Sequence, residues 1–276
     1  GRMPAQRMTT ARTVWLALLL VAVALAWALR TGTIAIPEAW NPWAPLRIAA
    51  PPNLLTGLKL TRASGDAAAC RTALAQAGMS MVPVDDRRTG EGCGFANAVR
   101  IERSSVAVGE SFALSCRAAL SLAMWERHVL QQAALAHLGA RVQRIEHLGS
   151  YACRNLYGED GRRRSQHATA DALDVAGFVL DDGRRVRVLG DWPKRDARAV
   201  SGAATGGEAM PAAAPSPPAT PAPATPPPVV DHAEAAFLRD VRDGACRYFD
   251  AVLGPDYNRA HADHFHFDRG RARICR

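Results

Sequence analysis

The stretch "DHFHFD", residues 263–268, constrains the fold of this chain more than any other feature. Successive side chains of a β-strand point to opposite faces, so its two histidines share one face and its two phenylalanines share the other. Phe265 and Phe267 can then enter a core while His264 and His266 stand together on the opposite side. With one more histidine just upstream, three of the chain's eight histidines fall within six residues. A metal or catalytic site explains this concentration of imidazole, and a pair of exposed strand histidines is the alternative.

A second polar cluster, "SQHATADALDV", begins at residue 165. Asp174 lies between Leu173 and Val175 at the start of a predicted strand, where a buried carboxylate is costly unless it is paired or binds a metal. His167, Asp174 and one C-terminal histidine would form a His₂Asp set, and three protein ligands leave a fourth position for water, as in catalytic zinc sites. The metal would lower the pKa of that water, and the other histidine of the pair would act as general base. Asp171, four residues after His167, is the rival ligand.

The N-terminal region contains an uncharged apolar run from Thr13 to Leu29 with arginines on both sides. Its length suits a short membrane span, and the positive flank before it predicts that everything after Arg30 is exported. We therefore expect residues 1–30 to anchor the chain in the inner membrane. A signal peptide cleaved near residues 24–26 and a buried core helix are the alternatives. Export, together with six cysteines that form no CxxC pair, predicts disulfides.

Composition and periodicity divide the rest of the chain. Residues 31–63 are rich in Pro and Trp and predict an extended tether, and residues 64–276 predict one domain with a disordered Pro-rich insert at about 202–230. Two β-rich runs around Asp182-Gly183 predict a hairpin. Apolar spacing predicts helices over 66–77, 115–138 and 231–254, and strands near 81–84, 99–102 and 141–149.

The formal net charge is +8 and comes mostly from scattered arginines. Such a surface could attract an anionic polymer. The chain has no zinc-finger spacing, no RNA-recognition motif and no long Lys/Arg block, however. We therefore expect no nucleic-acid partner and interpret the charge as a soluble basic surface.

The order of these motifs resembles that of a known group of enzymes. "SxHxxxxAxD" followed much later by "HxH" is similar to the LAS zinc peptidases, the group of lysostaphin, D-Ala-D-Ala peptidases and the hedgehog signalling domain. "DHFH" resembles the penicillin-insensitive murein endopeptidases. The wider context, "WNPWAPL", "GSYACRN", "SQHATADALDVAGF" and "VLGPDYNRAHADHFHFD", closely resembles the bacterial extensin-like C-terminal domain family, over residues 37–275 less the Pro-rich insert.

The resemblance implies a role for each matching histidine and aspartate. His167, Asp174 and His266 fall where the three zinc ligands sit, with one Zn²⁺ per chain. His264 falls where the endopeptidases carry a catalytic histidine. His261 matches another active-site histidine, and a solvated loop histidine is its alternative.

Two further residues are candidates for the site. Ser165 would orient a ligand by a hydrogen bond, with a turn residue as the alternative. Arg154 would clamp an oxyanion or a substrate carboxylate, because Arg bonds carboxylates bidentately, with a surface Arg as the alternative. The sequence departs from the peptidase pattern in two places: Ala170 stands where these enzymes carry Gly, and the insert lengthens the chain between Asp174 and His266.

The cysteines fit this picture as three pairs. Cys246 and Cys275 bracket the HxH strand, and a bond between them would pin it, with a loop-entropy gain of about 3 to 4 kcal/mol. Six cysteines allow many connectivities, and free buried thiols are the alternative. The remaining cysteines would complete the set as Cys116 with Cys153 and Cys70 with Cys93.

Together these features predict an α+β domain whose small antiparallel sheet carries a zinc site, with helices beside it, disulfides, and an N-terminal transmembrane anchor. The predicted function is zinc-dependent hydrolysis of peptide bonds in peptidoglycan, at the periplasmic face of the bacterial cytoplasmic membrane, or after secretion if a signal is cleaved. The alternative is a non-catalytic wall-binding or scaffold protein that keeps zinc for structure.

Overall fold

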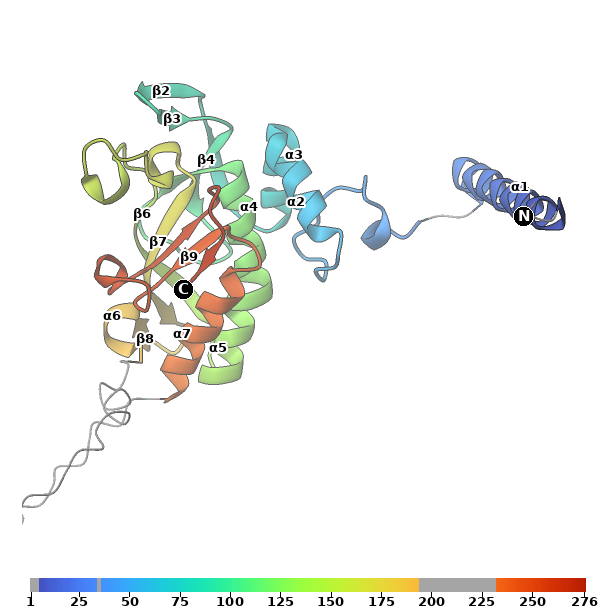
Figure 1. Cartoon of the computed structure of the whole chain (residues 1–276). Coiled ribbons are helices and arrows are strands. Elements are labelled where there is room, and N and C mark those ends of the chain that lie inside the picture. Colours follow the sequence, from blue (N-terminus) through green and yellow to red (C-terminus); the bar gives the residue numbers. More distant parts are fainter. Residues whose placement is uncertain (1–4, 34–35, 194–231) are drawn as a thin grey trace, which may run out of the picture.

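The computed structural model describes residues 5–33, 36–193 and 232–276, and its centre is a six-stranded sheet (Figure 1). The strand order is β11-β9-β10-β7-β6, and β8 also pairs with β7. All neighbouring strands are antiparallel except β9 and β11, which are parallel. The strands are β6 (Val142–Gly149), β7 (Ala172–Leu180), β8 (Arg185–Arg187), β9 (Ala251–Leu253), β10 (Phe265–Asp268) and β11 (Ile274–Cys275).

Two smaller sheets precede the central one in the chain. An antiparallel three-stranded sheet has the order β1-β4-β5, and β2 pairs with β3 in a separate hairpin. These strands are β1 (Ser80–Val84), β2 (Arg87–Gly90), β3 (Cys93–Phe95), β4 (Ala98–Arg103) and β5 (Phe112–Ser115).

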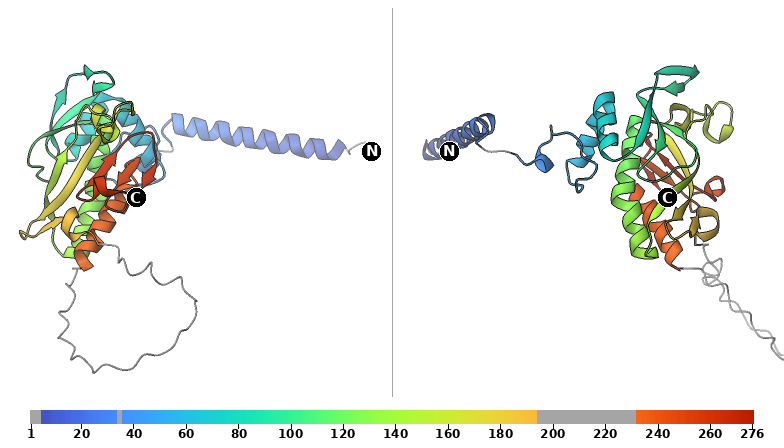
Figure 2. Two further views of the ribbon diagram at one scale, coloured as in Figure 1. Left: turned by 60° about the vertical axis from the view of Figure 1, so that its left-hand side comes forward. Right: turned by 180° about the vertical axis from the view of Figure 1, so that it is seen from behind.

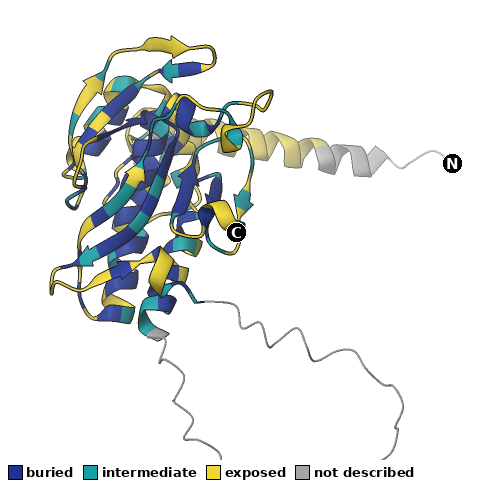
Figure 3. Ribbon diagram, turned by 90° about the vertical axis from the view of Figure 1, so that its left-hand side faces the viewer, coloured by how far each residue is buried: buried dark blue, intermediate teal, exposed yellow. Residues whose placement is uncertain are grey.

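Helices cover one face of the six-stranded sheet (Figure 1). A continuous helical run comprises α4 (Cys116–Trp125), a π-helical turn over Glu126–Leu130 and α5 (Gln131–Leu138), and α7 (His232–Ala245) packs beside it. The Trp125 ring meets the ring of Phe267 edge-on at 5.2 Å, and its indole N–H donates to the Val241 carbonyl at 3.0 Å. This aromatic contact joins strand β10 to both helices, and the inward sides of the layers are buried (Figure 3).

The chain before these layers packs partly against them. Helices α2 (Thr56–Gly65) and α3 (Ala67–Gln76) lie on α4, and the side chains of Leu46, Ile48 and Leu60 are buried. Residues 31–63 therefore do not form an extended tether throughout, because their later part supplies apolar side chains to the core. Helix α1 (Ala5–Arg30) stands apart from the rest (Figure 2).

Within the described ranges, no helix combines the length and the apolar character that crossing a membrane requires.

Most of the elements expected in the domain are present. The predicted helices over 66–77 and 115–138 appear as α3 and as the run from α4 to α5, which ends at Gly139 with φ 66°. The third helix ends at Ala245 and not at Gly254, because Ala251 and Val252 are buried in strand β9, which pairs with β10. The predicted start of this helix at Asp231 and the Pro-rich insert lie outside the described residues.

Three disulfides use all six cysteines. Cys246 is bonded to Cys275, as predicted. The other two predicted pairs are wrong. Helix α3 lies against α4, which brings Cys70 to Cys116, whereas the β2–β3 hairpin reaches over the segment after β6 and brings Cys93 to Cys153. The predicted combination of helices, a sheet and disulfides is confirmed.

The π-helical turn carries a fully buried carboxyl group. Oε2 of Glu126 accepts hydrogen bonds from the backbone N–H and the hydroxyl of Ser105, and Oε1 has no partner among the described residues. Burial raises the pKa of Glu126 from 4.5 to about 7, against the opposing effect of the bonds from Ser105 and Ser104.

This shift predicts how the stability of the domain depends on pH. Because the folded pKa lies above the unfolded one, the folded state keeps a proton that the unfolded chain has released, so the free energy of unfolding falls as pH rises from 4.5 to about 7. We expect a loss of about 3 kcal/mol attributable to Glu126 between pH 4 and pH 8, absent in Glu126→Gln. Urea unfolding of both proteins across this range measures the difference. Glu110→Gln, at an exposed glutamate, is the control; equal pH profiles for wild type and Glu126→Gln would refute the assignment.

Candidate metal centre

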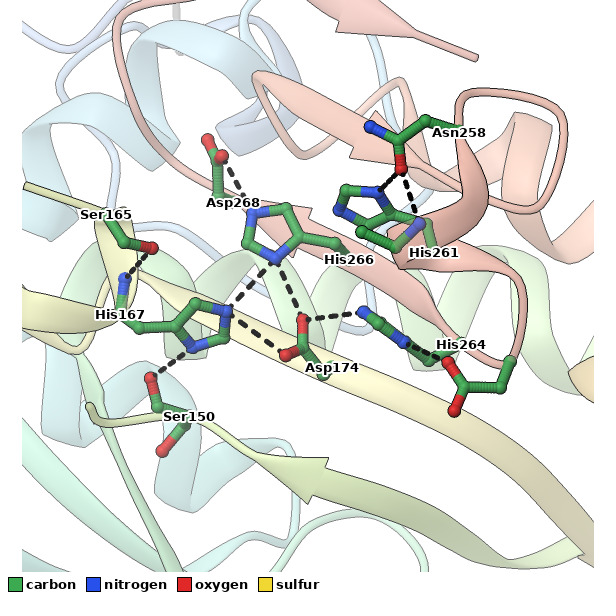
Figure 4. Close-up of polar contacts among 11 residues, drawn as sticks. Ser150, Ser165, His167, Asp174, Asn258, His261, His264, His266 and Asp268 are labelled. Carbon is green, nitrogen blue, oxygen red and sulfur yellow. Dashed lines mark hydrogen bonds and ion pairs between the residues drawn. The ribbon is translucent and has the colours of Figure 1, made fainter. Parts of the chain in front are cut away.

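Strand pairing places two of the predicted site residues opposite each other. In the antiparallel register of β7 and β10, Asp174 faces His266, and Phe265 faces Val175 on the core side. The Nδ1 atom of His266 lies 2.8 Å from Oδ1 of Asp174 (Figure 4). The alternation predicted from "DHFHFD" is therefore what brings imidazole and carboxylate together outside the core.

A short turn brings His167 to the same point. The 3₁₀ turn η4 (Gln166–Thr169) precedes β7, and the hydroxyl of Ser165 caps it by accepting from the His167 backbone N–H at 3.4 Å. The ring of His167 is oriented by a different group, because its Nδ1–H donates to the Ser150 carbonyl at 2.8 Å (Figure 4). Ser165 thus positions the backbone of His167 and not its ring.

Asp268 was given no role from sequence. Its Oδ2 accepts from Nε2–H of His266 at 3.0 Å, and its Oδ1 accepts from the backbone N–H of Gly270 at 2.7 Å. Asp268 lies two residues after His266 in β10, so strand alternation puts both side chains on one face. This spacing of two residues was the sequence feature that could have identified Asp268. The contact with the Ser150 carbonyl could not be predicted in this way, because every residue has a backbone carbonyl.

When both rings are neutral, the tautomers fixed by these contacts leave three acceptor atoms facing one another. Nε2 of His167 lies 3.2 Å from Oδ2 of Asp174 and 3.1 Å from Nδ1 of His266. Burial would raise the pKa of Asp174, but the contacts with His167 and His266 outweigh it and hold that pKa well below its usual range. Burial would likewise lower the pKa of His266, but Asp174 and Asp268 raise it to about 9. His266 therefore carries a positive charge at pH 7, and a bound metal ion would replace the proton between His266 and Asp174.

The same three residues could hold a metal ion. Their ligand atoms lie within 4.8 Å of one another. A tetrahedral ion with bonds of about 2.0 Å needs ligand atoms about 3.3 Å apart, close to the separations observed here. Because each imidazole donates its other N–H to a protein oxygen, both rings present a lone pair to the ion, as metal-binding histidines do.

Two further histidines border the cluster. Nδ1–H of His264 donates to Oδ1 of Asp263 at 2.8 Å, and its Nε2 lies 3.7 Å from Oδ1 of Asp174. Nδ1–H of His261 donates to Oδ1 of Asn258 at 2.7 Å. Burial, followed by the nearby His266 and His264 rings, lowers the pKa of His261 to about 4, so this ring is neutral at pH 7.

The cluster lines one wall of a cavity of about 350 Å³. His167, Asp174, His264 and His266 all reach it, so a molecule in the cavity would lie against them. Arg154 lines the same cavity, as the prediction of a clamp requires.

Asp171, the rival ligand, belongs to a different network. Its carboxylate receives two hydrogen bonds from Arg117, at 2.7 and 2.6 Å, and further ones from the hydroxyls of Ser115 and Thr169. The side chain is buried and its oxygens are fully used, so it ties η4 to α4 and is not available to a metal with His167.

Ala170 has φ 54°. This left-handed conformation favours glycine and costs an alanine about 1 kcal/mol. Ala170 ends η4, and its carbonyl accepts from the Ser115 N–H at 2.8 Å.

Comparisons with known proteins give one match. A family model described as "Extensin-like protein C-terminus" matches residues 68–207 and 226–276. The stretch between the two matched segments lies within the predicted Pro-rich insert. No curated protein and no solved structure matches the chain.

The two neighbouring aspartates allow a matched test. We expect Asp174→Asn to abolish binding of a divalent metal, because it removes a charged ligand, and to leave the fold intact. We expect Asp171→Asn to keep metal binding and to lower the free energy of unfolding by about 2 kcal/mol, since it weakens the bonds to Arg117. Metal titration with a competing chromophoric chelator and urea unfolding measure the two effects. Loss of metal in Asp171→Asn with an unchanged fold would reverse the assignment.

Proposed function

Because this chain belongs to the family of extensin-like protein C-termini, we propose that it is a zinc-dependent peptidase that cleaves peptides of bacterial peptidoglycan. The observation that carries the proposal is the convergence of His167 Nε2, Asp174 and His266 Nδ1 beside a cavity that also exposes His264. Three protein ligands and one open position are typical of catalytic zinc sites. The motif resemblance to LAS zinc peptidases supports the choice of substrate.

Zinc, when bound, supplies Lewis-acid chemistry that polarises a carbonyl group and activates water. The chain's own contribution begins with holding the ion: His167 and His266 direct their lone pairs inward because Ser150 and Asp268 accept their outer N–H groups. These outer contacts fix the ring orientations before any substrate arrives.

His264 is the proposed general base. Oδ1 of Asp263 accepts a hydrogen bond from Nδ1–H of His264, so Nε2 is the basic atom of the ring. This Nε2 faces the Asp174 side of the cavity. In that place it takes a proton from the attacking water and returns it to the leaving amine. A base is not needed in a purely structural zinc site, which favours the enzyme over a non-catalytic wall-binding or scaffold protein.

His261 has a different proposed role. Its Nδ1–H is committed to Asn258 and its ring is neutral at pH 7, so its Nε2 offers the cavity a hydrogen-bond acceptor without a charge. It would orient the substrate peptide by accepting from a backbone N–H.

The proposed location is the cell envelope, outside the cytoplasm. Three disulfides that use every cysteine are stable in an oxidising compartment. The exposed apolar side chains of α1 support attachment there to the membrane.

The decisive experiment combines zinc content with muropeptide digestion, for the full chain and for His264→Ala. We expect one zinc per chain in both proteins, cleavage products from the wild type, and a rate lower by about 10²- to 10⁴-fold in His264→Ala, because the proton transfer loses its base. Elemental analysis and separation of the muropeptides by liquid chromatography give the two readouts.

His137→Ala is the matched control, since His137 pairs with Asp240 and does not line the cavity; it should keep both zinc and activity. Zinc in the wild type without cleavage of any muropeptide would favour the scaffold protein. A wild type that binds no zinc would end the proposal.

A further inference from the structure

Arginines dominate the charge around the proposed metal site. The cavity is lined by five of them: Arg154, Arg162, Arg163, Arg164 and Arg271. The carboxylates that line it are Asp174 and Asp268, and both are already engaged with the histidines. The cavity therefore carries an excess of positive charge even before a cation is bound.

Two of these arginines already have partners. Nε of Arg162 lies 2.8 Å from Oε2 of Glu159. Arg164 donates to the Glu91 carbonyl at 2.8 Å and to Oδ1 of Asn155 at 2.9 Å, so its guanidinium braces the loop against the β2–β3 hairpin.

The other three make no side-chain hydrogen bond or ion pair with any described residue. Arg154 and Arg163 lie in the segment before η4, and Arg271 lies in the turn after β10, so they reach one cavity from two separate parts of the chain. All three are exposed at its mouth.

A guanidinium group presents paired N–H donors that match the two oxygens of a carboxylate. Peptides carry carboxylates at the C-terminus and on acidic side chains. A neutral peptide would provide no negative charge for the three arginines to bind. Since the arginines line the same cavity as the histidines, a peptide whose carboxylate binds them would present a nearby peptide bond to the metal site.

We propose that Arg154, Arg163 and Arg271 form a carboxylate-binding subsite that selects peptides with a free carboxylate close to the bond presented to the metal site. This subsite rests on the proposed peptidase function, because the peptide is a substrate only if the protein cleaves it. The preference for binding a carboxylate can be tested independently of cleavage. Long-range attraction by the same charges would also speed the arrival of anionic peptides at low salt.

The test measures binding without turnover, in full-length His264→Ala protein loaded with zinc. Isothermal titration compares acetyl-D-Ala-D-Ala with its C-terminal amide, and acetyl-D-Glu-D-Ala amide with acetyl-D-Gln-D-Ala amide. The first pair reports a C-terminal carboxylate and the second a side-chain carboxylate. We expect one carboxylate peptide to bind about tenfold more tightly than its neutral partner at low salt.

Variants at the arginines complete the test. Arg163→Gln/Arg271→Gln removes two of the three guanidinium groups and should lower that preference severalfold while leaving the affinity for the neutral peptide within about twofold. Arg162→Gln is the matched control, because Arg162 lines the same cavity but is paired with Glu159, and it should keep the preference within about twofold. Thermal unfolding checks that both variants fold. We expect that they do, because the substituted arginines are exposed.

Two results would overturn the subsite: equal affinity for the carboxylate and neutral peptides in both pairs, or a preference that is undiminished in Arg163→Gln/Arg271→Gln. Digestion of muropeptides by protein with an intact His264 separates the two proposals. Cleavage of muropeptides without a carboxylate preference in binding refutes the subsite and keeps the peptidase. A carboxylate preference that falls in the double variant, without cleavage of any muropeptide by the wild type, refutes the peptidase and keeps the subsite.

Discussion

The pairing of β7 with β10 is the constraint on which the rest of the molecule depends. Its register sets Asp174 opposite His266 on one face and Val175 opposite Phe265 on the other, so one alignment of the strands forms both the histidine–aspartate cluster and part of the core. A slip of one residue would turn the imidazole inward and a phenylalanine outward. The contact of Trp125 with Phe267 opposes such a slip, because it locks the apolar face of β10 against α4. Packing on one side of the sheet thereby fixes the positions of Asp174 and His266 on the other.

Electrostatics decides what the cluster can hold. Two imidazole nitrogens and a carboxylate meet in a poorly solvated place, and their outer N–H groups are already donated to the Ser150 carbonyl and to Asp268. Three electron-rich atoms about 3 Å apart repel one another unless positive charge lies among them. Asp171 shows the contrast a few residues away: there the positive charge is the guanidinium of Arg117, built into the protein. The charge of Asp171 is balanced by an arginine, whereas the charge of Asp174 faces two imidazole rings, where we propose a metal ion.

Local sequence patterns predict the elements that depend on neighbouring residues and fail where distant parts of the chain decide. Strand alternation was enough to foresee β10 and to bring His266 to the surface of the sheet, and helical spacing foresaw α3 and the long run from α4 to α5. The pairing of Cys70 with Cys116 could not be foreseen, because it depends on how α3 lies on α4. The helix predicted to run to Gly254 was overextended, since Ala251 and Val252 suit either a helix face or a strand, and only the neighbouring β10 selects the strand. The position of the Ser150 carbonyl likewise depends on where β6 ends, and it cannot be predicted from the type of residue at that position.

The three disulfides have a distribution that matters for the integrity of the chain. Cys70–Cys116 and Cys93–Cys153 lie wholly before residue 194, and Cys246–Cys275 lies wholly after residue 231. No covalent link apart from the backbone joins the two parts, although His167 and Asp174 come from the first and His266 from the second. They are joined by the ladder between β7 and β10 and by the packing of α5 on α7. A protease that cut once between residues 194 and 231 would leave two separately cross-linked fragments, and the domain would become a heterodimer whose centre exists only while its halves remain associated.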